Sequence, residues 1–294
     1  MIELRGIEKH FGGRPVLEDV GFRVHGGRMT GFIGGNGAGK TTTMRIILGV
    51  LAADAGTVEI DGTPIDAGAR RRFGYMPEER GLYPKMPLTE QLVYLARLHG
   101  LDAARARRST DDLVDRLGLG ERRDELVEKL SLGNQQRAQI AAALVHQPEM
   151  LVLDEPFSGL DPMAVEVVLG VLRDYAHAGS PVLFSSHQLD IVERLCDDVI
   201  IIAQGRIRAA GDREKLRESH SGLRYELTGT SDTGWLRGVP GIRVVEFDGD
   251  FAVFDADDGA AAQAVLRRAV ELGDVSGFTR RRPSLAEIFK EVVQ

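Results

Sequence analysis

The chain has 294 residues, 43% hydrophobic and 28% charged, which are the proportions of an ordinary soluble globular protein. Its formal net charge of −7 argues against nucleic acid as the main partner, because phosphate backbones favour a basic surface. The single cysteine, Cys196, cannot close a disulfide within the chain, so the fold does not depend on an oxidising compartment. The N-terminus lacks a signal-peptide layout, and no apolar run approaches the ~20 residues that span a bilayer, so we expect a cytoplasmic protein.

The first 60 residues predict several strands, one helix and a glycine-rich loop between them. In chain order, the predicted elements are strands over 1–25 broken at Gly12-Gly13, a short apolar strand over 29–34, a helix over 40–48 and a strand over 57–60. The succession of strand, glycine loop and helix over 29–48 matters for function, because it places free backbone N–H groups at a helix N-terminus.

Residues 88–147 predict a helical insert, because their apolar residues recur at helical spacing. The recurring positions are Leu92, Leu95, Ala96, Leu113, Leu117, Ile140, Ala143 and Leu144. Strand signals return at Met150–Leu153, 182–185 and 199–203, with helices between them. Strands that alternate with helices predict a mainly parallel α/β sheet.

After about residue 218 the pattern changes to that of a small α+β unit. The predicted elements are strands over 223–228, 242–247 and 251–255, a short helix near 231–236, a helix over 260–272, a weak strand and a last helix over 284–293. This order approaches β-α-β-β-α-β, which is typical of a ferredoxin-like fold. We therefore predict two domains, 1–218 and 219–294, with the helical insert inside the first.

The segment 34–41 reads Gly-Gly-Asn-Gly-Ala-Gly-Lys-Thr and matches the phosphate-binding pattern G-x-x-x-x-G-K-[ST]. Its glycines let the backbone curl so that N–H groups hold phosphate oxygens, and the following helix adds the positive end of its dipole. Lys40 would reach the β and γ phosphates of ATP, and the Thr41 hydroxyl would ligate Mg²⁺. A chance match has a probability of roughly one in a hundred. The predicted cradle comprises Gly34, Gly35, Asn36, Gly37, Ala38, Gly39, Lys40, Thr41 and Thr42.

The apolar strand Met150–Leu153 ends in two acids, Asp154 and Glu155. A buried strand that stops at adjacent carboxylates places them at the carboxyl edge of a parallel sheet, where ligands bind in open α/β folds. We expect Asp154 to hold Mg²⁺ and Glu155 to orient or deprotonate the attacking water. The alternative is an acidic cap of the next helix, and the cradle upstream in the same chain disfavours it.

Together with these two motifs, further segments in the same chain order resemble the ABC ATPase family over about residues 1–215. They are Gly-Tyr-Met-Pro-Glu at 74–78, in the position of the Q-loop; Leu-Ser-Leu-Gly-Asn-Gln-Gln-Arg at 130–137, similar to the family signature; Ser-Gly-Leu-Asp at 158–161, similar to the D-loop; and Ser-Ser-His at 185–187, similar to the switch-histidine segment. Phe11 lies where the family places an aromatic that stacks on adenine. Plain packing of a lone aromatic is the alternative for Phe11.

The residues themselves support the implied roles unevenly. Ser131 and Gly133, implied to contact nucleotide, precede a helix that we expect to begin near Asn134, and a helix N-terminus is an anion site. Simple helix capping by Ser131 is the alternative. His187, implied to contact the γ-phosphate, follows a buried strand and so lies at the same sheet edge as the acids. A structural histidine is the alternative there.

Four positions need comment against the family pattern. Glu78 stands where the Q-loop has glutamine, and a glutamate can ligate Mg²⁺ but adds negative charge to the site. The signature carries Leu132 and Asn134 in place of the usual glycine and glutamine. The D-loop residue Asp161, implied to contact nucleotide, precedes Pro162, so an ordinary N-cap is its alternative.

The resemblance implies a P-loop cassette with a mainly parallel sheet, an N-terminal antiparallel β subdomain and a helical insert. ATP would lie between Lys40 and His187 of one cassette and Ser131 and Gly133 of another, so a homodimer or a paired cassette is needed. The chain is similar to bacterial sodium- or drug-efflux exporters with a C-terminal appendage. This implies an ATPase that drives a separate membrane-spanning permease from the cytoplasmic face of the plasma membrane, with no nucleic acid partner.

Two other functions stay open from the sequence. One is a soluble ABC ATPase that acts on ribosomes or nucleic acid, although such chains usually carry two cassettes or a long coiled-coil insert. The other is a nucleotide sensor without activity, which the intact pair Asp154 and Glu155 disfavours. The run 280–282 consists of three arginines that could contact lipid or acidic protein, and a solvated charge run is the favoured interpretation.

Overall fold

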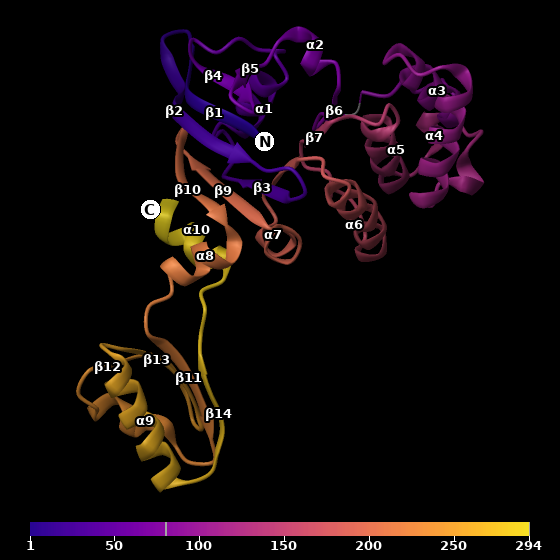
Figure 1. Cartoon of the computed structure of the whole chain (residues 1–294). Coiled ribbons are helices and arrows are strands. Elements are labelled where there is room, and N and C mark those ends of the chain that lie inside the picture. The colour runs from indigo at the N-terminus through magenta and orange to yellow at the C-terminus, as the bar shows by residue number, and fades with distance from the viewer. Residues whose placement is uncertain (80, 294) are drawn as a thin grey trace. The chain divides into compact units, whose positions relative to one another are not determined.

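The computed structural model describes residues 1–79 and 81–293. They form two compact units, Met1–Arg213 and Glu214–Val292 (Figure 1). The division falls at the start of α8 (Arg213–Ser219), a few residues before the predicted boundary after residue 218.

The first unit begins with an antiparallel sheet in the strand order β2-β1-β4-β5. Its strands are β1 (Ile2–Phe11), β2 (Arg14–Val24), β4 (Ala55–Ile60) and β5 (Thr63–Pro64). Buried and exposed residues alternate along β2, as expected where one face of a sheet packs on a core and the other meets solvent. The strands predicted over residues 1–25, broken at Gly12-Gly13, are therefore a hairpin of two long strands that turns at these glycines.

The central sheet has the strand order β10-β9-β3-β8-β7-β6. Its strands are β3 (Met29–Ile33), β6 (Phe73–Met76), β7 (Met150–Leu153), β8 (Val182–Ser186), β9 (Asp198–Ala203) and β10 (Arg206–Asp212). Neighbouring strands are parallel except at the β9–β10 edge. Strands β3, β7, β8 and β9 are buried along their whole length, which explains their continuous apolar runs. The prediction of a mainly parallel sheet is confirmed.

Four helices accompany the sheets of the first unit: α1 (Lys40–Ile47), α2 (Ala67–Arg70), α6 (Pro162–His177) and α7 (Leu189–Leu195). Helix α1 follows β3 directly through the glycine loop, and α6 follows β7 through the acidic pair. Because β3, β7 and β8 run in parallel, the loops that leave their carboxyl ends meet at one edge of the sheet.

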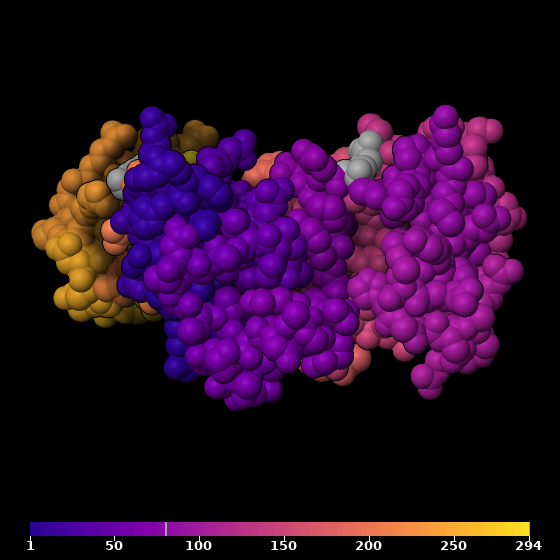
Figure 2. Space-filling model, turned by 90° about the horizontal axis from the view of Figure 1, so that it is seen from above, coloured from indigo at the N-terminus to yellow at the C-terminus, as the bar shows by residue number. Residues whose placement is uncertain are grey.

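The predicted helical insert is confirmed as three helices, α3 (Leu88–Leu98), α4 (Ala103–Arg116) and α5 (Leu132–Leu144), with two short 3₁₀ turns, η1 (Gly120–Arg122) and η2 (Val127–Lys129). Apolar residues at helical spacing, such as Leu92 and Ile140, are fully buried where these helices pack on one another. Figure 2 shows the insert, in magenta, as a lobe beside the indigo and violet N-terminal strands. Helix α5 begins at Leu132, two residues earlier than predicted, because Ser131 caps it.

The second unit contains a four-stranded antiparallel sheet in the order β12-β13-β11-β14. Its elements are β11 (Arg224–Gly229), η3 (Thr233–Gly238), β12 (Ile242–Asp248), β13 (Phe251–Ala256), α9 (Gly259–Leu272), β14 (Val275–Arg280) and α10 (Leu285–Val293). This is the ferredoxin-like order that was predicted, except that the first helix is a 3₁₀ turn. Leu227, Phe254 and Val265 are buried in its own core.

Within residues 1–79 and 81–293, no helix is both long enough and apolar enough to cross a bilayer.

Candidate active site

The glycine loop curls between β3 and α1 as the sequence pattern requires. Gly39 has φ of +111°, and a Cβ added there would come within 2.5 Å of Leu17 Cδ2. A Cβ on Gly34 would come within 2.5 Å of the Ile202 carbonyl oxygen. Glycine is needed at these two positions because the backbone is left-handed at one and tightly packed at both.

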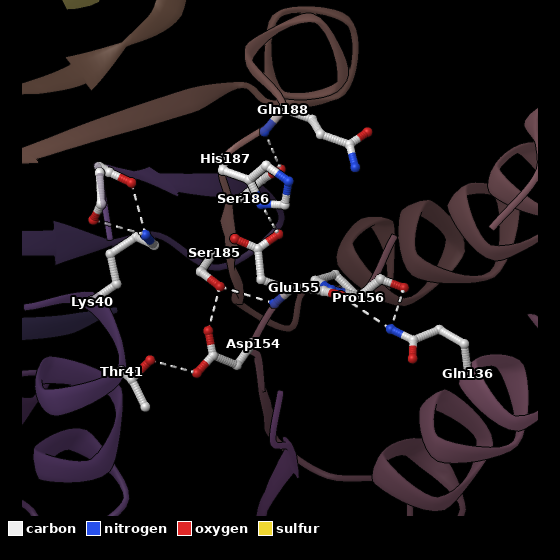
Figure 3. Close-up of polar contacts among 12 residues, drawn as sticks. Lys40, Thr41, Gln136, Asp154, Glu155, Pro156, Ser185, Ser186, His187 and Gln188 are labelled. Carbon is white, nitrogen blue, oxygen red and sulfur yellow. Dashed lines mark hydrogen bonds and ion pairs between the residues drawn. The ribbon is translucent and has the colours of Figure 1, made fainter. Parts of the chain in front are cut away.

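Lys40 lies at the first position of α1 and is largely buried. Its ammonium nitrogen Nζ donates to the carbonyls of Gly34, at 2.7 Å, and Gly35, at 3.3 Å. The side chain therefore folds back over the loop and places a positive charge where the free N–H groups of the helix N-terminus also lie (Figure 3). Such an arrangement is suited to a polyanion.

Asp154 follows β7 and is only 2% exposed. Its two carboxylate oxygens accept hydrogen bonds from two hydroxyls, Thr41 Oγ1 at 2.9 Å and Ser185 Oγ at 2.5 Å. A buried carboxylate needs such partners, and neither of them cancels its charge. Burial, together with the Asp154 carboxylate, raises the pKa of Tyr75 on β6. The Asp154 carboxylate therefore affects the pKa of a residue on the neighbouring strand.

Glu155 and His187 come from the ends of β7 and β8 and meet at the same edge of the sheet. Glu155 Oε2 lies 3.0 Å from His187 Nδ1 (Figure 3). The Glu155 side chain is 12% exposed, whereas that of His187 is 58% exposed. An acceptor that is shielded from bulk water beside an accessible imidazole is an arrangement suited to proton transfer.

A cleft of about 890 Å³ brings most of the predicted residues together. Its lining contains Phe11, Val16, Gly35, Asn36, Gly37, Ala38, Gly39, Lys40, Thr41, Thr42, Glu78, Asp154, Glu155 and His187. This volume is within the usual range for small-molecule sites. The polar residues gather at the glycine loop and the acids, while Phe11 and Val16 add apolar surface. The cleft can hold a ligand with an anionic end and an apolar, stackable end.

Phe11 is half exposed at the end of β1. The ammonium of Lys9 lies 5.7 Å from the centre of its ring and is held by Asp54 at 2.7 Å. A cation near one face of the ring leaves an aromatic surface in the cleft lining, which is compatible with stacking on a base.

Four of the predicted nucleotide contacts are not part of the cleft lining: Gly34, which lies just before it at the start of the glycine loop, and Ser131, Gly133 and Asp161. Ser131 is exposed and caps α5, accepting a hydrogen bond from the Asn134 amide at 3.3 Å, and Gly133 lies in the first turn of that helix. Asp161 caps α6 and accepts from the Ala164 amide at 2.8 Å. The capping alternatives for Ser131 and Asp161 therefore describe real contacts within this chain.

Sequence reasoning did not single out three residues of the site. Val16 follows the glycine turn of the β1–β2 hairpin and carries no motif. Ser185 was noted only as part of the histidine segment, and Gln136 only as part of the signature. Gln136 Nε2 donates to the backbone carbonyls of Glu155 and Pro156, at 3.0 and 3.1 Å. A local pattern cannot reveal such contacts, because the partners are brought together only by folding.

Comparison with known proteins agrees with this geometry. Residues 17–158 match the family described as ABC transporter, and residues 211–293 match the family described as ATP-binding protein DrrA1-3-like, C-terminal domain. An uncharacterized ABC transporter ATP-binding protein of Bacillus subtilis, YhaQ, is 34% identical over 100% of this chain and 98% of its own length. The Nod factor export ATP-binding protein I of Burkholderia lata is 38% identical over 75% of this chain and 74% of its own length.

Among solved structures, an ATP binding subunit of an ABC transporter superposes with a TM-score of 0.69. It is 34% identical and covers 74% of this chain and 92% of its own. The predicted fold class is thereby confirmed. The chain belongs to the family of ABC transporter ATP-binding proteins, and it is an ATPase that serves transport.

Proposed function

We propose that the chain hydrolyses ATP between two cassettes to drive export through a separate membrane-spanning subunit. The observation that carries the proposal is the separation of two sets of site residues. Residues 35–42 of the phosphate loop, the acids and His187 line the cleft, whereas Ser131, Gly133 and Asp161 do not. A cleft that lacks these contacts in one chain can acquire them from a second.

The residues outside the cleft form a second surface of the cassette. A Cβ on Gly133 would lie 3.7 Å from the Gly159 carbonyl, so the signature turn packs beside the loop that leads to Asp161. On this surface Leu132 is 61% exposed and Met163 is 77% exposed. Exposed apolar side chains next to a helix N-terminus suit a partner that brings both protein surface and phosphate.

The donors in the cleft fit a magnesium ion. Thr41 offers a hydroxyl, and Asp154 and Glu78 offer carboxylates, so the set is made of the oxygen donors that Mg²⁺ prefers. When bound, the ion would supply positive charge that offsets the negative charge of the phosphates. We assign Thr41 and Asp154 to it, with Glu78 as a further oxygen donor in place of the usual glutamine.

The chain's own residues would then carry out the hydrolysis. The loop amides and Lys40 hold the phosphates, and Glu155 accepts the proton of a water that attacks the γ-phosphorus. The bond from that phosphorus to the bridging oxygen breaks, and ADP leaves with the electron pair. His187, within reach of Glu155, would contact the γ-phosphate and orient the carboxylate. Phe11 would stack on the adenine.

We also propose a direction of transport and a location for this chain. One relative is named for Nod factor export, which supports an exporter. We propose a permease in a separate chain, with this ATPase on the cytoplasmic face of the plasma membrane. Nucleotide chemistry would reside in residues 1–218, and residues 219–294 would be an accessory domain. A ribosomal or nucleic-acid role gains no support from a net charge of −7.

Pairing of cassettes can be tested with a variant that binds ATP without cleaving it. We expect the molar mass of Glu155→Gln, measured by light scattering, to double on addition of Mg²⁺ and ATP. With ADP the variant should remain a monomer. Ser131→Arg in the same background should stay single, because the bulky side chain blocks the second surface. If Glu155→Gln has the same mass with ATP as with ADP, the proposal that two cassettes pair is wrong. Affinity purification from membranes should separately recover a polypeptide with several apolar spans.

A further inference from the structure

Glu155 has an unusual backbone for its residue type. Its φ is +52°, in the left-handed region that residues other than glycine rarely adopt. Four other non-glycine residues in the described ranges share a positive φ, namely Asp19, Asp61, Gln147 and Gln204, and none of them lines the cleft. Such a conformation persists only where surrounding contacts enforce it.

Two buried side chains hold the Glu155 backbone from its two sides. The Glu155 N–H donates to Ser185 Oγ at 2.9 Å, and the same hydroxyl donates to Asp154. The Glu155 carbonyl accepts from Gln136 Nε2 at 3.0 Å (Figure 3). Ser185 belongs to β8 of the central sheet, whereas Gln136 belongs to α5 of the helical insert.

The side-chain amide of Gln136 is buried and faces two hydrogen-bond acceptors. Gln136 is 5% exposed, and Nε2 faces two carbonyl oxygens, those of Glu155 and Pro156. Because both neighbours are acceptors, the amide must present its NH₂ group, and both of its hydrogens are used. The bonds tie the second turn of α5 to the segment that carries the Glu155 carboxylate.

We propose that Gln136 is a positioning residue through which helix α5 sets the orientation of the Glu155 carboxylate. The inference rests on the proposed role of Glu155 in hydrolysis. Loss of the two bonds frees the Glu155 and Pro156 carbonyls, so the left-handed backbone relaxes and the carboxylate moves relative to His187 and the γ-phosphate. Movement of the insert, which carries Ser131 and Gly133 on the same helix, reaches the water-activating group by the same route.

The test compares two variants of the full-length chain. Gln136→Glu keeps the shape but points oxygens at two carbonyls, and Gln136→Met keeps the length and packing without a donor. We expect kcat for ATP to fall about 10- to 100-fold in both, since a misplacement of about 1 Å can cost 10²-fold in rate. KM for ATP should change less than about threefold, because these residues do not hold the phosphates.

A pH profile separates positioning from general damage. The carboxyl group that Gln136→Glu introduces has one O–H when protonated and can donate one of the two lost bonds, whereas its ionised form can donate none. The ratio of kcat for Gln136→Glu to kcat for the wild type should therefore rise as the pH is lowered. The same ratio for Gln136→Met should stay flat. A flat ratio for both variants would overturn the proposal.

Two reference variants make the outcome unambiguous. Gln91→Glu is the matched control, because Gln91 is similarly buried in the insert and donates to the Tyr83 carbonyl at 3.2 Å, far along the chain from Glu155. It should lower the melting temperature without lowering kcat. Glu155→Gln reports on the proposed function itself. If Glu155→Gln stops turnover while both Gln136 variants keep it, only the positioning role fails; if Glu155→Gln keeps turnover, the proposed role of Glu155 fails.

Discussion

Two acidic residues, one in each unit, have opposite surroundings. Asp154, at the carboxyl edge of the central sheet, is 2% exposed, and its side-chain partners within residues 1–79 and 81–293 are two hydroxyls. Asp255, on β13 of the second unit, is 22% exposed and is paired with the guanidinium groups of Arg224 and Arg243, each at 2.6 Å. Among the described residues, Asp154 therefore has hydroxyl partners and no cationic one, whereas Asp255 is ion-paired within the protein. An acid whose charge is held but not neutralised is the better guide to a binding site.

The arginine run 280–282 belongs to the same contrast. Arg281 lies 3.7 Å from Glu287, and Arg282 lies 3.3 Å from Glu214 and 3.8 Å from Glu218. Arg280 donates to the Ser221 carbonyl at 3.4 Å. These contacts support a solvated, ion-paired run over a lipid-binding one, the two interpretations that the sequence left open.

The largest effect should come from Glu155, the residue that we propose activates the attacking water. Glu155→Gln removes the proton acceptor but keeps its size, so kcat for ATP should fall about 10²- to 10⁴-fold, the usual value of a general base. Equilibrium binding of a fluorescent ATP analogue should change little. Turnover at the wild-type rate would show that the buried acids of the cleft are no more functional than the paired acids of the second unit.

The next effect concerns the positive side of the cleft. Lys40→Ala removes a charge that reaches phosphate, so ATP should bind about 10²-fold more weakly, since a hydrogen bond to a charged group contributes roughly 1.5–3 kcal/mol. Isothermal titration measures this directly. Lys85→Ala removes the same charge from an exposed position outside the cleft and should have no effect. Equal affinities for wild type and Lys40→Ala would count against the cradle.

A half-buried titratable group away from the cleft, His146, tests whether burial alone marks function. His146 Nε2 lies 3.2 Å from the Phe73 carbonyl, and its ring stacks on that of His99 with centroids 3.8 Å apart. Burial, and secondarily the charge of His99, lowers the pKa of His146 from 6.5 to about 4. The folded state therefore binds fewer protons than the unfolded state between these values, and its stability falls as the pH drops through this window.

At about 1.4 kcal/mol per pKa unit, the loss in the free energy of unfolding amounts to at most about 3.5 kcal/mol, and to less in practice because the site is partly open to solvent. Urea unfolding at several pH values would measure it. His146→Gln, which can still donate to the Phe73 carbonyl, should flatten the dependence between pH 6.5 and 4. An unchanged slope would show that other groups set the acid sensitivity.

The smallest effect belongs to the second unit. The Arg224 guanidinium, followed by that of Arg243, lowers the pKa of Asp255, so its contribution to stability is present above its ordinary pKa and is lost as the pH falls through the lowered value. Asp255→Asn should cost about 1 kcal/mol or less, because Arg243 is largely exposed. Thermal unfolding and kcat should be compared; a loss of turnover here would break the contrast between the two acids.

The sequence alone determined what depends on local backbone chemistry. Gly34 and Gly39 are needed where the phosphate loop curls, Ser131 caps a helix, and an apolar run followed by two acids places Asp154 and Glu155 at a sheet edge. These features need only a few consecutive residues, so a one-dimensional pattern contains them. Periodicity likewise predicted the helical insert and the order of elements in the second unit.

Only the tertiary structure decided which distant side chains meet around the cleft. Ser185 meets Asp154, Gln136 meets the Glu155 carbonyl, and Glu155 meets His187 because parallel strands and α5 bring separate segments together. The same holds for the partners of the arginine run and for the choice of a 3₁₀ turn over Thr233–Gly238. Such contacts depend on packing between elements, and the spacing of residues along the chain carries no record of it.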